Sequence, residues 1–520
     1  MRSATWGSVI AGLCVLLLSA SPAGATPFVT AGLGAGERTT AVASPPVAGS
    51  AADVVRYVDR QRGVMHLPGV AVVVIRDGRP LVSRGFGEAA PGGAPVTPKT
   101  PFVLGSTSKQ FTGLIVQRLV LQGLLNLDTT AHQVLPWFGT GSDRLSRVTV
   151  RELLTHTSGL STRVGLAQWG WRVGRANSIT AGVRAITNAD LTAAPGKRFE
   201  YSNSNYDILG AIIESVLKEP YARALQELVA APLGLFSTTG DLGHPPPGLA
   251  AGYYVWFGGL PAVTPAPQVP SSVPSARVVS TASDLARVVA AHLRGDPGPL
   301  GPALTAARAP LARVNEYSQY ASGLWVRPLW ELHAGNENTT GGGLASCIEH
   351  DGQTDRSMSY VLACPALGLG VVALANAGQG PDNGLWWRFH NGLVHAVLGT
   401  PPGTFAPDPV IRYATVIFLG VPLVLLLALA AQVRAVRRRR HVFGWSAPAV
   451  VLGGGALWLG YVYAPGRADG DAIHAMWSVV PDLAASTIVS TLLTLTSLAV
   501  LGVAVLRRAP HQPGTPRRPA

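Results

Sequence analysis

The hydrophobic pattern near the start of the chain predicts a segment that directs export. A short apolar run over residues 9–18 follows a charged start and precedes small residues at 23–25. This order is typical of a secretory signal peptide, so we expect residues 1–25 to be removed. An uncleaved membrane anchor is the alternative, although the run is short for a span. Residues 26–50 are rich in Ala, Pro, Gly and Thr without a lasting period, which predicts a disordered linker.

Residues 51–398 combine strand and helix patterns and form the predicted main domain. After a helical stretch at 53–64, the sequence GVAVVVIRDGRPLVSRGFGEA has two β-branched runs around Asp77-Gly78, which predicts a hairpin. Helical spacing follows from Ser106 to Gly123.

The rest of this domain is helical in the middle and strand-like at the end. Residues from about 124 to 310 are loop-rich with short helical patterns such as NYDILGAIIESVL, and strand character returns from about residue 320. LASCIEHDG, SMSYVLACP and LGLGVVALANA then read as three successive strands. Strands at both ends of the domain predict one α/β sheet closed by distant segments, with a helical insert.

The C-terminal part carries long apolar runs behind a turn-rich linker at 399–412. Each is long enough to span a bilayer, and they lie at 413–433, 442–464 and 483–506. Arginines concentrate at 434–441 and in the basic tail 507–520, which predicts that both are cytoplasmic and that residues 26–410 lie outside the cell. Buried core helices are the alternative, and the charged flanks argue against it.

Composition agrees with a membrane protein and excludes several other classes. Apolar residues make up 47% of the chain and charged residues 13%, and the three cysteines exclude a disulfide scaffold or a cysteine-rich zinc domain. The net charge of +13 comes largely from the C-terminal arginine clusters, without a basic stripe interleaved with aromatics. We therefore expect no nucleic-acid partner. The histidines show no ligand spacing, so no metal or other cofactor is expected.

The stretch GSTSKQFTG holds the first candidate for chemistry. Ser106 and Lys109 are three residues apart, so a helix starting here would place the hydroxyl and the amine side by side. A serine hydroxyl is a poor nucleophile near neutral pH and needs a nearby base or cation. The spacing alone is common, and the start of a surface helix would explain it equally well.

Two later motifs could join this pair. YSNSNYDILG contains Tyr201 and Asn203 shortly after a Pro-Gly turn, and EHDGQ places His350 and Gly352 at the end of a predicted strand. Glycine there permits a ligand or another backbone to approach closely. Taken separately, each motif could serve packing alone.

Taken in order, these motifs resemble the serine β-lactamase-related hydrolases, which include class C β-lactamases, D-alanyl-D-alanine carboxypeptidases and related esterases. The resemblance rests on FVLGSTSKQFTGLIVQRL, VTVRELLTHTSGL, PGKRFEYSNSNYDILG, APLGL and VVSTASDLARV, and it covers roughly residues 50–395. S-x-x-K is a signature of penicillin-recognising enzymes. The resemblance implies an antiparallel sheet flanked by helices.

The resemblance also implies catalytic roles. Ser106 would be the acylated nucleophile, and Lys109 would stabilise its alkoxide and relay protons. Tyr201, with its pKa lowered by nearby cations, would be the general base and later protonate the leaving group. His156 in LLTHTSGL is interpreted as structural.

Substrate-binding roles follow from the same resemblance. Asn203 would bind the substrate's amide or support Lys109, and His350 with Gly352 would fill the slot that holds K-T-G or H-x-G in relatives. The backbone N–H groups of Ser106 and Gln353 would form the oxyanion hole.

Departures from the family pattern bear on the substrate. Arg356 and Ser357 stand where relatives carry Gly and then an aromatic, which predicts a reshaped edge with an added cation near the substrate. His350 in place of lysine removes a permanent charge that the β-lactam carboxylate would need. We expect a membrane-anchored hydrolase of esters, amides or D-Ala peptides. A true β-lactamase and a non-catalytic binding or signalling module are the alternatives. The sequence does not indicate the oligomeric state.

Cys347 and Cys364 allow two outcomes. A tight hairpin centred near Asp355-Arg356 would place them opposite each other, and an oxidising compartment would permit a disulfide. Two buried free thiols are the alternative.

Overall fold

The computed structural model describes residues 48–167, 177–187, 189–256, 260–264, 269–295, 298–329, 346–378, 384–401, 420, 422–434 and 481–506. The chain divides into two compact units, one of residues 41–412 and 478–480 and the other of residues 1–40, 413–477 and 481–520. The first unit carries every candidate motif. The expected signal peptide, most of the expected linker 26–50 and the basic tail lie outside the described residues.

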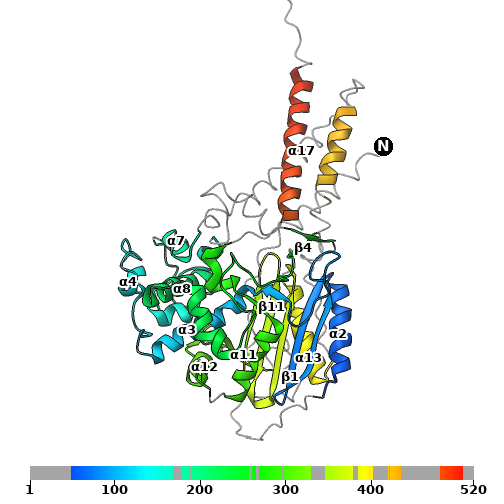
Figure 1. The fold of residues 1–520 in the computed structure, drawn as a ribbon. Helices are drawn as coiled ribbons and strands as arrows, with labels where there is room; N and C mark the ends of the chain where they lie inside the picture. Colours follow the sequence, from blue (N-terminus) through cyan, green and yellow to red (C-terminus); the bar gives the residue numbers. More distant parts are fainter. Residues whose placement is uncertain are drawn as a thin grey trace, which may run out of the picture. The chain divides into compact units, whose positions relative to one another are not determined.

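An antiparallel eight-stranded sheet forms the centre of the first unit (Figure 1), in the order β2-β1-β12-β11-β10-β9-β8-β7. Its strands are β1 (Gly69–Arg76), β2 (Arg79–Gly87), β7 (Ala312–Arg313), β8 (Gln319–Tyr320), β9 (Trp325–Pro328), β10 (Ser346–Gln353), β11 (Met358–Cys364) and β12 (Leu369–Ala375). The first strand pairs with the last, so the predicted α/β sheet closed by distant segments is confirmed.

The backbone of the β1–β2 hairpin explains why the sequence around Asp77-Gly78 predicts it. Asp77 and Gly78 both have positive φ angles, of 51° and 76°, as the tightest hairpin turns require. Val70, Val72 and Val74 pack into the core on one face of the sheet, whereas alternate residues such as Val73 pack into the core on the other. Burial on both faces explains the continuous apolar run.

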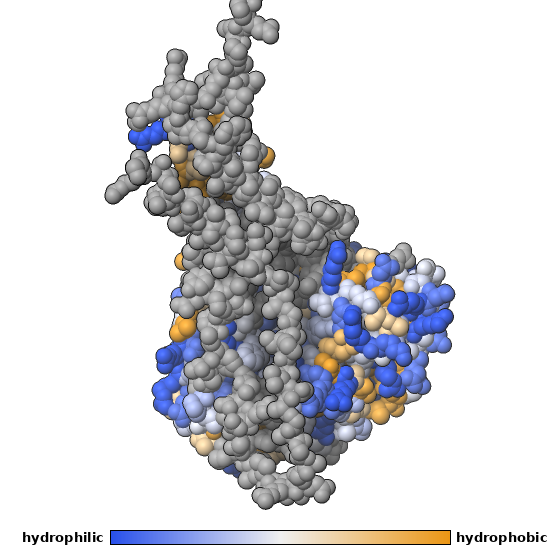
Figure 2. Space-filling model, turned by 180° about the vertical axis from the view of Figure 1, so that it is seen from behind, coloured by the Kyte–Doolittle hydropathy of each residue, from blue (hydrophilic) through white to orange (hydrophobic). Residues whose placement is uncertain are grey.

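Helices cover both faces of this sheet (Figure 1). The helices α2 (Ala51–Val64) and α13 (Gly384–Leu398) pack together on one face, and α11 (Ala282–Arg294) packs against β1, β11 and β12 on the other. On that second side lies the helical insert, with α3 (Lys109–Leu121) and α8 (Asn203–Leu217) in the same hydrophobic core. Figure 2 shows hydrophilic residues interspersed with small hydrophobic patches over the insert. Shorter helices complete the unit, namely α4 (Ala131–Val134), α5 (Val150–Leu154), α6 (Thr162–Ala167), α7 (Ile179–Arg184), α9 (Tyr221–Leu225), α10 (Ala231–Leu233) and α12 (Gly301–Arg308).

Two small sheets hold segments beside the candidate site. The strand β3 (Pro101–Val103) pairs with β6 (Val279–Thr281), and β4 (Tyr253–Trp256) pairs with β5 (Leu260–Val263) and β13 (Ala377–Gly378). A helical turn, η1 (Gly105–Ser108), follows β3, and another, η5 (Val273–Arg277), precedes β6. The pairing of β3 with β6 therefore brings these two turns together.

The β10–β11 hairpin has the register that its cysteines required. Ile348 pairs with Ala363, so Cys347 and Cys364 lie opposite each other, and they form a disulfide with a Cα–Cα distance of 4.3 Å. Both residues are fully buried. The disulfide alternative is therefore the one found.

The second unit is described at residue 420, over residues 422–434 and over α17 (Pro481–Leu506). None of the helices in the described ranges combines the length and the apolar character needed to cross a membrane. The expected run 483–506 lies within α17, most of 413–433 is described from residue 422, and 442–464 lies outside the described residues. The three expected membrane-spanning helices are therefore not confirmed.

Candidate active site

The Ser106–Lys109 pair is assembled by a helical turn that runs directly into a helix. Ser106 lies on η1 and Lys109 is the first residue of α3. The Lys109 Nζ donates to the Ser106 Oγ at 3.3 Å. The structure thus places the hydroxyl and the amine side by side, as the spacing predicts.

Lys109 is fully buried and held by two further acceptors. Its Nζ donates to the Asn203 Oδ1 at 2.7 Å and to the backbone carbonyl of Ser275 at 2.9 Å. Burial lowers the pKa of Lys109 to about 7, although the carboxylates of Asp207 and Asp351 act in the opposite direction. A substantial fraction of the amine is therefore uncharged at neutral pH and able to accept a proton.

Tyr201 lies against the same amine. The Lys109 Nζ is 4.8 Å from the centre of the Tyr201 ring. The Tyr201 hydroxyl is buried and completes no hydrogen bond, although the Ser106 hydroxyl is near enough to lower its pKa. Burial outweighs that influence and raises the pKa of Tyr201 well above its usual value. The expectation of a lowered tyrosine pKa is wrong because desolvation dominates and the nearby amine is itself partly discharged.

Two glycines bring the candidate oxyanion donors together. A Cβ on Gly352 would lie 2.9 Å from the backbone nitrogen of Ser106, and a Cβ on Gly105 would lie 2.4 Å from that of Gln353. Gly105 also has a φ of 61°, which favours glycine. The loop before Ser106 therefore lies directly against the end of β10, and the two backbone amides share one location.

His350 is brought to the site as an uncharged ring. Its Nε2 lies 3.2 Å from the Tyr320 hydroxyl, and its ring centre is 6.2 Å from that of Tyr201. Burial and the charge of Lys109 lower the pKa of His350 to about 3. The H-x-G slot therefore supplies no permanent positive charge, as the sequence indicates.

His156 packs directly on Tyr201, with ring centres 4.2 Å apart. Its Nδ1 accepts hydrogen bonds from the backbone N–H of Ser202 at 3.2 Å and from the Asn205 Nδ2 at 3.0 Å. It thus fixes the segment that carries Tyr201 and Asn203. These contacts agree with a structural role.

Two groups near Lys109 were missed by sequence reasoning. Ser275 contributes a backbone carbonyl, which no side-chain pattern reveals. Asp207 is fully buried on α8, four residues after Asn203, and this spacing places both on one face of the helix. That spacing was the available signal for Asp207.

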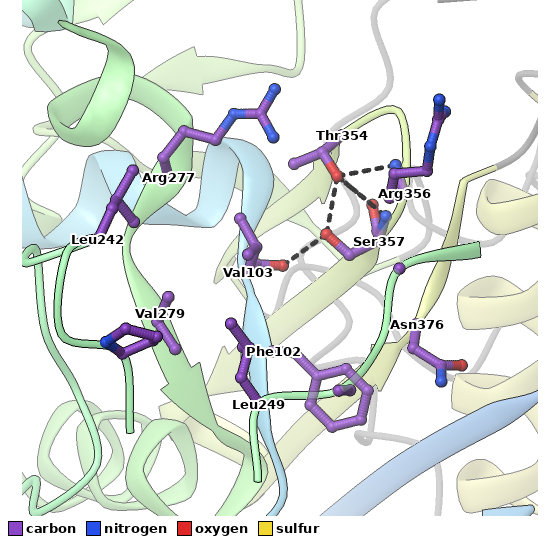
Figure 3. A pocket seen from close by; sticks show the side chains of 13 residues that line it. Phe102, Val103, Leu242, Leu249, Arg277, Val279, Thr354, Arg356, Ser357 and Asn376 are labelled. Carbon is purple, nitrogen blue, oxygen red and sulfur yellow. Dashed lines mark hydrogen bonds between the residues drawn. The ribbon is translucent and has the colours of Figure 1, made fainter. Parts of the chain in front are cut away.

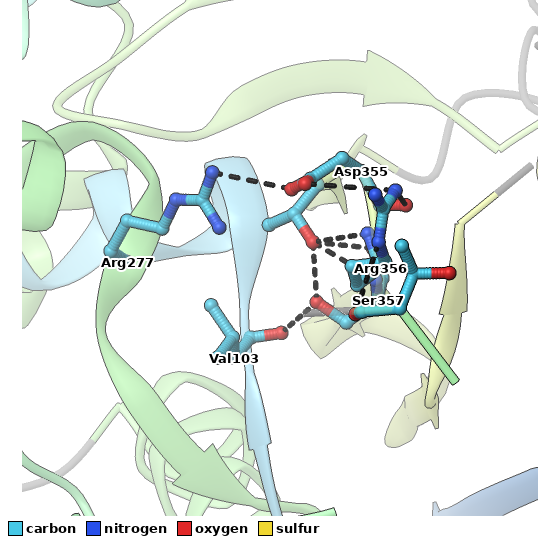
Figure 4. Close-up of polar contacts among 7 residues, drawn as sticks. Val103, Arg277, Asp355, Arg356 and Ser357 are labelled. Atoms are coloured by element: carbon cyan, nitrogen blue, oxygen red, sulfur yellow. Dashed lines mark hydrogen bonds and ion pairs between the residues drawn. The ribbon is translucent and has the colours of Figure 1, made fainter. Parts of the chain in front are cut away.

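The turn after β10 differs from the expected edge with an added cation. The Arg356 side chain is only 5% exposed, and its guanidinium lies 3.7 Å from the Asp355 carboxylate and 5.2 Å from the centre of the Tyr254 ring. The Ser357 hydroxyl donates to the backbone carbonyl of Val103 at 2.7 Å. Figure 4 shows Asp355 between Arg356 and Arg277. The Arg356 cation is therefore paired with Asp355, and its side chain also lines the cavity beside this turn.

A cavity of about 190 Å³ lies beside this turn (Figure 3). Apolar side chains form much of its wall, including Phe102, Val103, Leu249 and Val279, while Thr354 contributes a hydroxyl. Two of its lining residues, Phe102 and Val103, belong to β3, which ends three residues before Ser106.

Comparison with known proteins supplies a family. The family model described as Beta-lactamase matches residues 54–393. Penicillin-binding protein 4 of Amycolatopsis lactamdurans is 30% identical over 385 residues, covering 67% of this chain and 90% of that protein. Protein flp of Staphylococcus aureus is 31% identical over 190 residues in strain MW2, covering 36% of this chain. In strain MRSA252 it is 26% identical over 329 residues, covering 62% of this chain. The matches span only 37% and 62% of these two flp proteins.

Solved structures agree on the fold. The octameric penicillin-binding protein homologue from Pyrococcus abyssi superposes with a TM-score of 0.57 at 22% identity, covering 70% of this chain and 80% of that one. EstCE1, described as a hydrolase with promiscuous acyltransferase activity, superposes with a TM-score of 0.56 at 26% identity, covering 67% of this chain and 98% of that one.

Proposed function

Since the chain belongs to the Beta-lactamase family of serine hydrolases, we propose that it cleaves an ester, an amide or a D-Ala-type peptide through an acyl-enzyme on Ser106. The observation that carries this proposal is the Ser106–Lys109 contact of 3.3 Å, within a buried site that lowers the pKa of the lysine to about 7. A neutral amine beside a hydroxyl is the arrangement that activates a serine nucleophile.

In the first step, Ser106 attacks the carbonyl carbon while the uncharged Lys109 amine takes the hydroxyl proton. The lowered pKa of Lys109 and the raised pKa of Tyr201 favour the lysine as proton acceptor, in place of the tyrosine that the resemblance implies. The backbone N–H groups of Ser106 and Gln353 would stabilise the negative oxygen of the tetrahedral intermediate.

In the second step, the bond to the leaving group breaks and the neutral Tyr201 phenol donates its proton to the departing oxygen or nitrogen. Lys109 returns the proton taken from Ser106 to Tyr201, so the acyl-enzyme forms without a net change in protons. Water then attacks the acyl carbon by the same route, which releases the acid and restores the Ser106 hydroxyl.

The substrate proposed is an ester or peptide in preference to a β-lactam. The uncharged His350 leaves the H-x-G slot without a permanent cation for a β-lactam carboxylate. The likeness to EstCE1, described as a hydrolase with promiscuous acyltransferase activity, supports ester cleavage, and the relation to a penicillin-binding protein supports D-Ala peptides.

A serine-reactive phosphonate and a small ester such as nitrophenyl acetate test this function. We expect the phosphonate to attach to Ser106, and Ser106→Ala to abolish both labelling and turnover. Tyr201→Phe should slow acylation by about 10²–10⁴-fold, the usual range for a lost acid–base group. A wild-type protein that neither takes up the probe nor cleaves an ester or a D-Ala peptide would favour the non-catalytic binding module.

We also propose that the hydrolase unit is exported and attached to the cell membrane. Support comes from the sequence alone, through the signal-like residues 1–25, the long apolar runs and the arginines at 434–441 and 507–520. By the positive-inside rule this arrangement leaves residues 26–410 outside the cytoplasm.

A further inference from the structure

We propose that Asp207 is a positioning residue that sets the charge of Lys109 during catalysis, an inference that rests on the proposed hydrolase function. Asp207 lies on α8 one helical turn after Asn203, whose side-chain oxygen accepts from the Lys109 amine. The helix therefore presents a neutral acceptor and an acid to the same side of the molecule.

The surroundings of Asp207 make its ionised form costly unless a positive charge lies nearby. It is fully buried, and Ser275, which lies near enough to lower its pKa, does not complete a hydrogen bond with either carboxylate oxygen. A buried carboxylate is costly unless a positive charge or strong donors compensate it. Lys109 is the charged group that stabilises the ionised form of Asp207, while burial raises the pKa of Asp207 to about 7.

Ser275 lies beside both side chains. Its backbone carbonyl accepts from Lys109, while its side chain and backbone help to hold the pKa of Asp207 down. Because the pKa of each group is near 7 and each depends on the other, the acid and the amine titrate as a pair.

Several other titratable groups interact electrostatically with Lys109 or Asp207. Asp351 on β10 also raises the pKa of Lys109, and Tyr221 on α9 feels the charge of Asp207. His156 and His350 feel the charge of Lys109, and burial keeps both rings uncharged at neutral pH. Tyr201 and Tyr206 are held as neutral phenols by burial. Of the two carboxylates, Asp207 therefore has the larger effect on the pKa of Lys109.

During catalysis, Asp207 stabilises the protonated form of Lys109. When Lys109 takes the Ser106 proton it becomes a buried cation, and the Asp207 carboxylate offsets part of the cost of that charge. Without the carboxylate, the lysine is a weaker base and the tetrahedral intermediate is less stable. Asp207 thus acts through Lys109 and not on the substrate.

The lysine content of the chain permits a direct measurement. The sequence has four lysines, and Lys99, Lys197 and Lys218 are exposed, so Lys109 is the buried one. In protein labelled with carbon-13 at lysine Cε, we expect the signal of Lys109 to have a midpoint near pH 7. Asp207→Asn should lower the midpoint of this signal by about one unit or more. An unchanged or raised midpoint would overturn the proposal, and this readout needs no turnover.

The pH profile of ester hydrolysis tests the same idea in catalysis. The acid limb of kcat/KM should follow Lys109, and Asp207→Asn should move it to lower pH by a similar amount and reduce the plateau roughly tenfold. Asp207→Glu should restore part of both. Glu214→Gln, the same chemical change on a half-buried residue of α8, should leave the limb in place. If the acid limb of kcat/KM moves by the same amount in Asp207→Asn and Glu214→Gln, the role proposed for Asp207 is refuted. A wild-type protein without any activity would instead count against the proposed function.

A double variant covers the case in which Asp207→Asn folds poorly. The single change removes a carboxylate that acts on Lys109, so Lys109→Met should cost less thermal stability in the Asp207→Asn background than in the wild type. If Lys109→Met lowers the melting temperature equally in both backgrounds, the pairing of the two groups is refuted.

Discussion

At the residue scale, the candidate site depends on glycines as much as on its polar side chains. Gly352 has no room for a methyl group, because a Cβ there would lie 2.2 Å from the backbone carbonyl of Leu104. The two backbone amides proposed as the oxyanion hole exist as a pair only because β10 and the Ser106 loop approach this closely. Removing one such donor costs about 10²–10³-fold in kcat in serine hydrolases.

We therefore expect Gly352→Ala to lower kcat for ester hydrolysis by about 10²-fold or more, since the loop before Ser106 must move away. Steady-state kinetics with nitrophenyl acetate measure the effect. Gly63→Ala on α2 is the matched control, because its added methyl group meets no atom within 4 Å. Equal kinetics for the two variants would show that the close approach has no part in catalysis.

Residue identities near the nucleophile were predictable, but their charge states were not. Ser106 and Lys109 are related by helical spacing, which the sequence displays. The direction of the Tyr201 pKa depends on how completely water is excluded, and residues as distant in sequence as Tyr320 and His350 help to enclose that space. The pairing of Arg356 with Asp355 likewise depends on the path of a turn.

At the scale of elements, the β10–β11 hairpin is both a structural and a chemical unit. Its disulfide joins Cys347 to Cys364 at one end, and His350 and Gly352 lie further along the same strand. Its register was predictable because a tight turn fixes which residues face each other. The pairing of β1 with β12 was expected only as a sheet closed by distant segments, because no local signal specifies a partner so far away.

Reduction of this disulfide should destabilise the unit by roughly 3 kcal/mol, the amount that the chain-entropy model assigns to a loop of this size. Urea unfolding with and without reductant measures the difference. The double variant Cys347→Ala/Cys364→Ala should be equally stable with and without reductant. An oxidised wild type no more stable than the reduced form would show that the hairpin is held by its strand pairing alone.

At the scale of the whole molecule, the candidate site lies in one unit and the long apolar runs lie in the other. The unit of residues 41–412 and 478–480 contains the family match and the candidate site. Residues 413–506 carry the long apolar runs, and the arginine-rich segments lie between and after them. The proposed membrane attachment predicts a fixed sidedness for these parts.

Protease added to intact cells should therefore cut within residues 26–410 and spare an epitope placed after residue 507. The same protease added to lysed cells should remove the epitope, which controls for its accessibility. Loss of the epitope in intact cells would contradict the proposed orientation.

The pairing of β1 with β12 also sets an order of events during synthesis. The first strand is made about 300 residues before the strand that covers its open edge, since Val70 pairs with Ala375. At about 5–20 residues per second, the ribosome needs roughly 15–60 seconds to produce that partner. Throughout this interval the β1–β2 hairpin exposes an unpaired, apolar edge of the kind that promotes aggregation. We therefore expect the nascent chain to need shielding of this edge until its last strands emerge.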